Sequence, residues 1–466
     1  MVVNHVKRII YGIVGLIGTC GQVQAQDPVV QRLTLPQAME LTQQNYPSIK
    51  AKQAQQEAAN YQAEAVRNQR LPEVQFQDQH TFASFNNLAG AYFPNEGSVI
   101  PVSGAARPAS WQGVWGSFTS LLVNWRVFNF GRLQANEAVA RRGQQASQAD
   151  TENEIFQQQV RVADAYLNWL VLHRVVAVQQ ANLARTQQFE QAVTTRAAAG
   201  LRPGVDSSVA RAESAKARLL LLESRQNEQT QLLQLHEMMG VRSGVYQPDT
   251  SFYSRQPQLA LESANAGEAP SLRFLQAQAE QSQAQAEAIR KSYWPSIFVL
   301  GSFGGRGSGI DNLTGEVSGN FGQGIPYRIG NYLVGVSTRW NLSALPRIRN
   351  ETRAEQLRGD VFRQQYRQEQ LRLNRQSETA DLRTAYARQQ LLEAPIQTTA
   401  ARNAYTQATT RYQTGLGTLV EVAQSFVLVN RAEVDEAVAN NNLWRSLLLK
   451  AAAQGDLSVF LNQLTH

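Results

Sequence analysis

Cysteine is nearly absent from this sequence, with Cys20 as the single residue of its kind among 466. The amino-terminal segment that contains it is expected to be removed, so the mature chain can form neither a disulfide nor a thiolate metal site. The few histidines lack a metal-ligand spacing such as i, i+4; they are His5, His80, His173, His236 and His466. The sequence therefore predicts no metal and no cofactor.

Long apolar runs and catalytic motifs are absent as well. Beyond the amino terminus, no apolar run is long enough for a transmembrane helix. We find no nucleophile elbow and no phosphate-binding loop. The segment GGRGSG at 304–309 is interpreted as a glycine-rich loop, because a predicted strand rather than a helix follows it. The acidic residues are scattered along helical stretches, where solvation explains most of them, so we predict a protein that is not an enzyme.

Residues 1–25 have the pattern of a secretory signal peptide. Two basic residues precede the short apolar core IIYGIVGLIGT, and VQAQD supplies a small-residue cleavage site after Ala25. Lipid attachment at Cys20 is an alternative, since Ile17 stands three residues before it, although Thr19 is bulkier than the residue usual at its position. Removal of the signal lowers the formal net charge from +7 to +5. The charges are interspersed, so we expect no nucleic-acid partner.

The rest of the chain contains two similar halves. Pro47 and Pro72 enclose a polar, alanine-rich stretch as long as the one between Pro270 and Pro295. Each stretch has a helical composition, and an alternating pattern begins after its second proline, which is a natural boundary between helix and strand. We therefore predict the same order of elements in both halves, a helix followed by strands.

The predicted β-hairpins span 72–128 and 295–341. The halves align again at Trp125 and Trp340, and their difference in length falls between the strands, where sequence rich in Gly, Asn and Ser predicts loops. Weak alternation over about ten residues is typical of strands in transmembrane barrels. It is equally typical of an edge hairpin on a soluble domain, so periodicity alone leaves both open.

Long helices follow the hairpins. The stretch 131–196 contains no proline and would extend about 98 Å as a helix, which requires a coiled-coil-like layer. Its apolar residues recur every seven positions, at Ile155, Val162, Trp169, Val176 and Leu183. The later helices show the same period in the series Val205, Ala212, Leu219, Gln226, Leu233 and Val420, Val427, Val434, Asn441, Leu448. The polar step at Gln226 and Asn441 either fixes the register of a buried seam or faces solvent.

The two predicted repeats run from 26 to 240 and from 269 to 466, and the segment 241–268, rich in Pro, Ser and Gly, links them. Each repeat ends in a long helical hairpin with a tip turn, at 197–206 and at 412–421. The two turns share an Arg, a Gly, a Leu, a Val and an acidic residue at a constant offset of 215.

Together these features resemble the TolC family of outer-membrane channel proteins. The residues that carry the resemblance are the duplicated helices ending at Pro72 and Pro295, Trp125 and Trp340, the turns Gly200…Asp206 and Gly415…Glu421, and LTLPQAMELTQQNYP at 33–47. The resemblance implies a mainly α fold with a membrane β-barrel. Three chains would each give four strands to one twelve-stranded barrel in the outer membrane of a Gram-negative bacterium, and their helices to a coiled-coil α-barrel in the periplasm. Loops at about 83–113 and 304–329 would face outside.

The resemblance also implies roles for the tip residues. Those matching the family's periplasmic gate and pore constriction are Asp206, Tyr412, Glu421 and Gln424. Those expected to form the docking surface for a periplasmic adaptor are Gly200, Leu201, Gly415, Leu416 and Gly417. Asp206 and Glu421 also stand at helix starts, where the helix dipole favours a carboxylate, so a structural role is the alternative for both.

The sequence departs from the family pattern at two of these positions. Gln424 replaces a second acidic ring, so cation selectivity should be weaker, and Gly417 replaces a basic residue, which excludes a basic–acidic latch centred there. The implied function is a passive exit duct of a tripartite efflux or type I secretion system, with an adaptor, an inner-membrane pump of RND or ABC type and outer-membrane lipid as partners. The alternative is a periplasmic coiled-coil adaptor or scaffold, although adaptors usually carry one helical hairpin per chain. Drug efflux, metal efflux and protein secretion all remain open.

Overall fold

The computed structural model describes residues 31–84, 92–95, 98–101, 111–242, 244–253, 255, 257, 269–311 and 313–463. The predicted signal peptide and Cys20 lie outside the described residues, as does part of the predicted linker 241–268. The chain divides into two compact units, each built from separate stretches of sequence. The first comprises Met1–Asn45, Arg161–Pro257 and Ala387–Arg445, and the second Tyr46–Val160, Gln258–Tyr386 and Ser446–His466.

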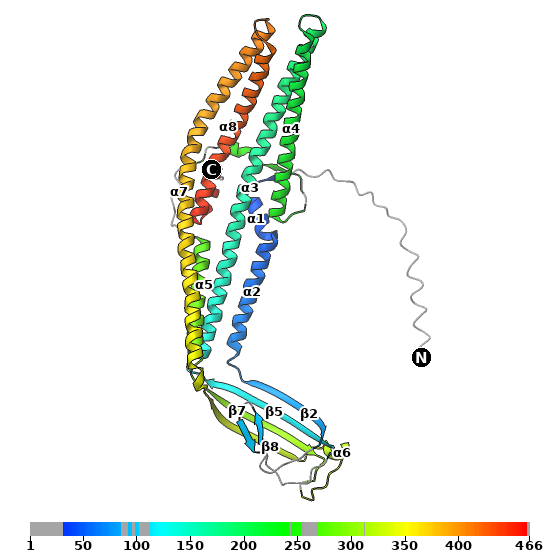
Figure 1. Cartoon of the computed structure of the whole chain (residues 1–466), viewed down its shortest axis with the longest axis vertical. Coiled ribbons are helices and arrows are strands. Elements are labelled where there is room, and N and C mark those ends of the chain that lie inside the picture. Colours follow the sequence, from blue (N-terminus) through cyan, green and yellow to red (C-terminus); the bar gives the residue numbers. More distant parts are fainter. Residues whose placement is uncertain are drawn as a thin grey trace, which may run out of the picture. The chain divides into compact units, whose positions relative to one another are not determined.

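Four long helices dominate the fold, as the proline-free stretches predict (Figure 1). They are α3 (Arg132–Ala198), α4 (Gly204–Met239), α7 (Leu345–Gln413) and α8 (Leu419–Gln454). Their order within the first unit follows from side-chain contacts. His173 of α3 lies 2.5 Å from Glu228 of α4, and Glu433 of α8 pairs with Arg185 of α3 at 2.8 Å and with Arg402 of α7 at 3.0 Å. The order α4–α3–α8–α7 leaves α4 and α7 at the two edges.

A small β-element completes the first unit. The strand β1 (Gln31–Leu33) pairs in parallel with β6 (Tyr246–Pro248), next to the helix α1 (Leu35–Asn45) and the 3-10 turn η1 (Thr250–Tyr253). The hydroxyl of Tyr166 donates to the Leu33 carbonyl at 2.7 Å and accepts from the Asp249 amide at 3.0 Å. The ring of Phe252 is buried against Trp444, with centroids 5.1 Å apart. Part of the segment that shows no period in the sequence is therefore folded against the helices.

The heptad series is expected to mark the buried face of each helix. This prediction is confirmed in α3 and is wrong in α4. Val162, Trp169 and Val176 are buried. In contrast, Val205, Leu219 and Leu233 are between 65% and 67% exposed. The residues that α4 buries are a different set, namely Ala210, Ser214, Ala217, Leu221, Gln231, Leu235, His236 and Met239. In the described part of the chain, the leucine face of α4 therefore stays exposed.

The polar step in the two series has different surroundings in the two repeats. Gln226 is exposed, so it faces solvent in the single chain, whereas Asn441 is half-buried. Its series in α8 is also mixed, because Val420 and Val427 are exposed and Leu448 is buried. The two helices therefore do not pack in equivalent ways.

The second unit contains the remaining helices and the main sheet. The two proline-started helices are α2 (Pro47–Asn68) and α5 (Pro270–Lys291), and proline suits the first helical turn, where its missing N–H costs nothing. The short elements are β3 (Tyr92–Asn95) with β4 (Ser98–Pro101), α6 (Phe321–Gly324), η2 (Leu342–Ala344) and α9 (Ser458–Asn462). Among the described residues, no helix combines the length and the apolar character needed to cross a membrane.

The two predicted hairpins join into one antiparallel sheet. Its strands are β2 (Glu73–Ala83), β5 (Val114–Phe128), β7 (Ser296–Ser308) and β8 (Ile329–Arg339), in the order β2-β5-β7-β8. The pairing of β5 with β7 links the two repeats, and β2 and β8 form the edges.

The predictions of loops at 83–113 and 304–329 were partly wrong. The first range contains the β3–β4 hairpin, and β7 continues through the predicted glycine-rich loop as far as Ser308. The glycines are needed within the strand because other backbone comes close. A Cβ on Gly304 would lie 2.6 Å from the Thr119 carbonyl oxygen, and one on Gly307 would lie 2.3 Å from that of Pro326. Glycine here permits close backbone approach rather than a loop.

Candidate functional site

The two tip turns have the same backbone structure. Gly200 and Gly415 end α3 and α7 in the left-handed conformation, with φ of +74° and +86°. In each turn the amide of the following leucine donates to a carbonyl five residues earlier, at 3.0 Å for Leu201 and 2.8 Å for Leu416. Glycine is favoured because this conformation costs other residues about 1–2 kcal/mol. Leu201 and Leu416 are 73% and 76% exposed, so each turn presents an uncovered leucine side chain.

Side chains of the first turn hold the end of α7. The hydroxyl of Tyr412 donates to Asp206 Oδ2 at 2.9 Å. Arg202 donates to the Tyr412 carbonyl at 2.6 Å, and its guanidinium lies 4.6 Å from the centre of the Tyr412 ring. Arg196 donates to the Gln413 carbonyl at 3.1 Å. The arginines thus bond carbonyls at the end of α7, where positive charge also complements the helix dipole. The Tyr412 carbonyl accepts from the Gly415 amide as well, at 3.2 Å.

Tyr412 is the centre of this contact. Its side chain is only 2% exposed and packs in an apolar cluster with Phe189, Leu419, Val422 and Phe426. Burial, together with the hydrogen bond to Asp206, raises the pKa of Tyr412 to about 12. Because the folded pKa lies above the ordinary value of 10.0, the stabilisation is complete below pH 10 and is lost as the pH rises towards 12.

The other predicted gate residues lie apart from this contact. Glu421 and Gln424 are exposed on α8. The amide of Glu421 donates to Thr418 Oγ1 at 3.3 Å, which places the Glu421 carboxylate in the first turn of α8. Of the four predicted gate residues, the structure brings together Asp206 and Tyr412.

Gly417 has a packing reason to lack a side chain. A Cβ there would lie 3.1 Å from Arg411 Cβ and 3.2 Å from both the Tyr412 amide nitrogen and Glu421 Oε2. A long basic residue does not fit without movement of its neighbours. The second tip turn is therefore stabilised without a basic side chain at position 417.

Arg202 is the tip residue that the sequence reasoning missed. The constant offset of 215 places Arg202 at the position equivalent to Gly417. The basic residue absent from the second turn is thus present in the first, where it contacts Tyr412. The offset of 215, applied to Gly417, would have revealed it.

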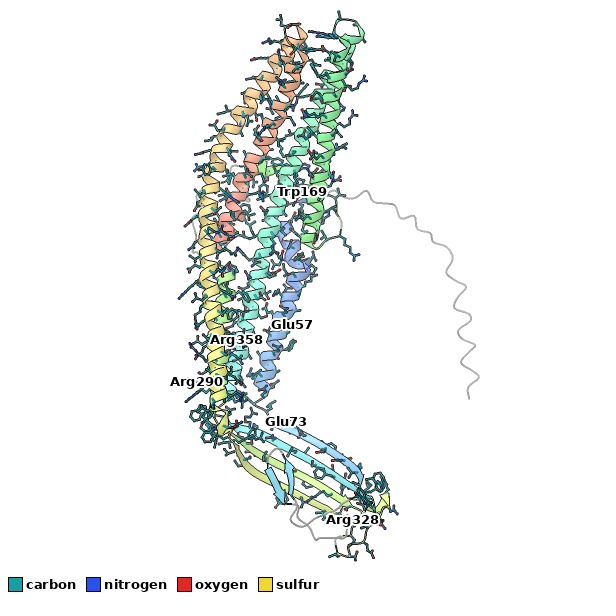
Figure 2. The ribbon with its side chains drawn as sticks, in the orientation of Figure 1. Glu57, Glu73, Trp169, Arg290, Arg328 and Arg358 are labelled. Atoms are coloured by element: carbon teal, nitrogen blue, oxygen red, sulfur yellow. The ribbon has the colours of Figure 1, made fainter. Side chains whose placement is uncertain are left out.

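The four-stranded sheet has two chemically different faces, because residues paired across antiparallel strands point to the same side. One face is mainly apolar and exposed; it carries Val74, Phe76, Leu121, Trp125, Phe303, Tyr332, Val334 and Val336. Asp78 on this face is bonded by the Tyr327 hydroxyl at 2.9 Å and by His80 at 3.1 Å. The opposite face is polar along β2, with Glu73, Gln75, Gln77 and Gln79. Figure 2 labels Glu73 and Arg328 at the two ends of the sheet.

Two tryptophans mark the end of the sheet next to the helices. Trp125 Nε1 donates to the Arg70 carbonyl at 2.9 Å, and Trp340 Nε1 donates to the Tyr293 carbonyl at 3.1 Å. Both acceptors stand two residues before the proline that precedes the first strand of their repeat. The two repeats therefore anchor strand to helix through the same contact.

A second aromatic group lies at the other end of the sheet. The ring of Trp115 lies 5.2 Å from Phe82 and 5.0 Å from Phe321. Ten residues separate Trp115 from Trp125 on β5, which is about 33 Å along a strand and about 25 Å for a strand tilted by roughly 40°. That spacing matches the apolar band of outer-membrane sheets, which aromatic residues flank on both sides.

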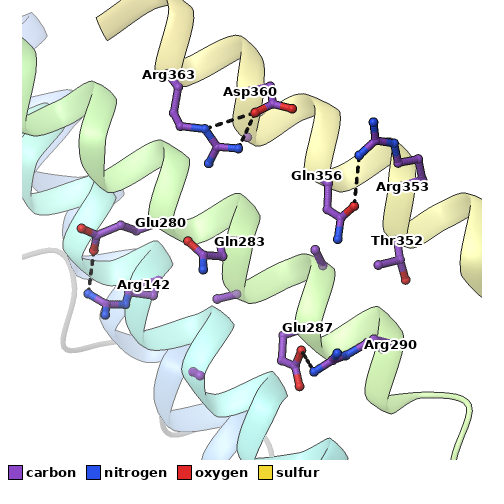
Figure 3. Close-up of a pocket in the computed structure, with 14 residues that line it drawn as sticks. Arg142, Glu280, Gln283, Glu287, Arg290, Thr352, Arg353, Gln356, Asp360 and Arg363 are labelled. Atoms are coloured by element: carbon purple, nitrogen blue, oxygen red, sulfur yellow. Dashed lines mark hydrogen bonds and ion pairs between the residues drawn. The ribbon is translucent and has the colours of Figure 1, made fainter.

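A groove of about 900 Å³ lies between α3, α5 and α7 in the second unit (Figure 3). Most of the charged side chains that line it are paired; the pairs are Arg142–Glu280, Arg290–Glu287 and Arg363–Asp360. Charges that neutralise one another in this way give the groove little net attraction for an ion. Among the described residues, no group of three His, Cys, Asp or Glu side chains could hold a metal.

The fold is similar to that of solved outer-membrane channels. The open-state MtrE channel of Neisseria gonorrhoeae matches with a TM-score of 0.69 and 16% identity, over 91% of this chain and 89% of that one. VceC of Vibrio cholerae matches with a TM-score of 0.70 and 17% identity, over 91% of this chain and 96% of that one. CmeC of Campylobacter jejuni matches with a TM-score of 0.73 and 15% identity, over 90% of this chain and 85% of that one. A search of curated proteins gave no match.

The family follows from the sequence itself. The model of the outer membrane efflux protein family matches residues 38–241 and 257–449, and the chain belongs to that family. It is an outer-membrane channel protein that serves as an exit duct, with its helical part in the periplasm. The two matches confirm the tandem repeat and the fold class, and nothing supports the adaptor alternative. Proteins of this family and fold are channels rather than enzymes.

Proposed function

We propose that three copies of this chain assemble into the exit duct of a tripartite efflux or type I secretion machine. A periplasmic adaptor docks on its helical tips, and an inner-membrane pump of RND or ABC type supplies the cargo. The duct itself is passive and has no catalytic activity. The observation that carries the proposal is the open sheet, whose apolar face is exposed.

An open sheet of this kind requires partners in lipid. In the described part of the chain, β2 and β8 each pair with one strand only, so each leaves a row of backbone N–H and C=O groups unpaired. Each such group costs several kcal/mol in hydrocarbon, because no water is present to bond it. Three sheets joined β2 to β8 form one closed sheet of twelve strands and leave no edge.

The exposed faces of the edge helices support the same assembly. α4 carries Leu219 and Leu233 on its uncovered face, and α7 carries Leu392 and Ile396 on the opposite edge of the first unit. Exposed apolar residues along one face of a long helix are typical of association surfaces. In a ring of three copies, α4 of one copy lies against α7 of the next.

The tips have two roles in this assembly. The exposed Leu201 and Leu416, with their supporting glycines Gly200, Gly415 and Gly417, form the adaptor surface. The contact of Tyr412 with Asp206 and Arg202 is the latch that holds the periplasmic end closed. Glu421 and Gln424 line the narrowest part of the pore, where three copies of Glu421 attract cations.

We place the repeat boundaries where the sequence analysis has them, with repeats at 26–240 and 269–466 and a connecting segment at 241–268. The compact units cut across these repeats, since each unit takes residues from both. A duplicated chain whose copies pack side by side gives this result. The repeats follow the duplication in the sequence, and the units follow the packing of the chain.

Fractionation of a bacterium that expresses the chain tests the proposal. We expect recovery in the outer-membrane fraction as an assembly of three copies that conducts ions in a planar bilayer. An unrelated periplasmic protein, expressed in the same cells, controls for leakage between fractions. Recovery as a periplasmic monomer, or an outer-membrane protein without conductance, would contradict it.

A further inference from the structure

The face of the sheet opposite the apolar one is polar along β2 and mixed on β5 and β8, where Phe118, Leu122, Ile329 and Leu333 are exposed. This face, called the polar face below, carries an excess of positive charge. Its arginines are Arg126 on β5, Arg306 on β7 and Arg339 on β8. Glu73 is the acidic residue on the same face of the four strands. Placement on this face keeps the guanidinium groups out of lipid, where each would cost about 2–4 kcal/mol at mid-membrane. The net result is two positive charges on the polar face of each chain.

Two of the arginines are held together at the end of the sheet near Trp125. The guanidinium of Arg126 lies 5.3 Å from the centre of the Phe298 ring, and that of Arg339 lies 5.1 Å from the same ring. The ring is buried beneath them. A shared aromatic platform therefore fixes two like charges near one another through cation–π contacts.

These arginines also lack acidic partners. None of the ion pairs between described residues involves Arg126, Arg306 or Arg339. The helical arginines differ, since Arg290 pairs with Glu287 and Arg445 with Asp164. Like charges without a counter-ion repel one another, so their attraction for a mobile anion is left uncompensated.

We propose that the membrane-spanning part of the duct is selective for anions, through Arg126, Arg306 and Arg339 on its inner face. The inference rests on the proposed function, because closure of three sheets makes the polar face the lining of the pore. Arg126 and Arg339 then form a ring of six guanidiniums at the periplasmic end of the membrane span, and Arg306 forms a ring of three nearer the outside. Rings of basic side chains are the usual basis of anion selectivity in pores.

The proposal assigns the cargo a chemical class. Solutes with carboxylate, sulfonate or phosphate groups would concentrate in this segment, and cationic solutes would be depleted. This preference is opposite to that expected at the tips, where Glu421 attracts cations. The selectivity of the whole duct is therefore measured with the tip latch released, so that the membrane segment contributes most.

The test uses the full-length chain with Tyr412→Phe and Arg202→Gln, reconstituted in planar bilayers under a KCl gradient. At 0.1 M salt or below, where charges act over about 10 Å or more, we expect chloride to permeate about two- to fivefold better than potassium. Arg126→Gln with Arg339→Gln should bring the ratio close to one. Glu73→Gln should raise it, since the same face then loses its acid.

A conservative variant separates charge from packing. Arg126→Lys with Arg339→Lys keeps both charges while it changes their contact with Phe298, and it should retain the selectivity. The inference would be overturned if the Arg126→Gln, Arg339→Gln variant kept the permeability ratio of the parent. It would also be overturned if the parent preferred potassium and Glu73→Gln left the ratio unchanged. Either result would still be consistent with the proposed function as an exit duct. Absence of channels from every preparation would instead overturn the proposed function, and this inference with it.

Discussion

A chain with Tyr412→Phe and Arg202→Gln is expected to conduct at least about tenfold better than the parent in planar bilayers. The variant removes the hydroxyl bond to Asp206 and the charged bond to the Tyr412 carbonyl. The first bond has a carboxylate acceptor and the second a guanidinium donor, and a hydrogen bond to a charged group contributes about 1.5–3 kcal/mol. Because about 1.4 kcal/mol shifts a closed–open equilibrium tenfold, removal of both bonds in three copies strongly favours the open tip.

A matched control uses the same helix. Tyr405→Phe with Arg411→Gln removes a hydroxyl and a guanidinium near the same tip and keeps both the Tyr412–Asp206 bond and the Arg202 bond. The hydrogen bond that Arg411 makes to the Leu416 carbonyl is long and therefore weak, at 3.4 Å. This control should conduct like the parent. Equal conductance of the parent and the Tyr412/Arg202 variant would show that the latch residues are structural and that the gate lies elsewhere.

Alkaline pH provides a second readout of the same latch. The raised pKa of Tyr412 means that the hydroxyl stays protonated, and keeps donating to Asp206, up to about pH 10. Between pH 10 and about 12 the tyrosinate forms next to a carboxylate and the bond is lost. Conductance of the parent should therefore rise over this range. In Tyr412→Phe alone, that rise should be absent.

Replacement of Leu219 and Leu233 by aspartate is expected to abolish the three-copy assembly. Both leucines are exposed in the single chain, so the fold of one copy should tolerate the change. Burial of each against the next copy would contribute about 1.5–3 kcal/mol, and an aspartate there adds the cost of a buried, unpaired charge. With several kcal/mol lost at each of three interfaces, we expect monomers in size-exclusion chromatography coupled to light scattering, and no conductance.

Leu201→Asp is the control for this experiment. Leu201 is as exposed as Leu219 but lies in a tip turn, away from the proposed contact between copies. It should assemble and conduct like the parent. If the Leu219/Leu233 variant remained trimeric, the exposed face of α4 would have to serve another partner.

The features predicted best from the sequence are those that require an unusual backbone conformation. Prolines located the starts of α2 and α5, and glycines located both tips, because few other residues fit those conformations. Tyr412 and Asp206 were also identified, through the resemblance, and the structure places them in contact.

The wrong predictions for α4 and β7 share a physical cause. A pattern in the sequence does not show which other part of the structure packs against the residues that form it. A heptad series identified an apolar face of α4 that is exposed in the single chain, whereas a different set of α4 residues is buried. One of the buried residues, Ala210, shares an apolar cluster with Phe189 and Val193 of α3. The glycines of β7 gave the same pattern as a loop, because close backbone approach and turning both require glycine. Arg202 was missed because the basic residue of the family pattern was sought only in the second turn, at Gly417.

The central claim, that three open sheets close edge to edge around one pore, is tested most directly by cross-linking between copies. The mature chain is expected to lack cysteine, so Cys residues placed at Phe76 on β2 and Val334 on β8 would be the only thiols. A short bifunctional thiol reagent applied to outer membranes should give a ladder of one, two and three chains that stops at three. A ladder that continues beyond three, or one that stops at a single chain, would contradict the account.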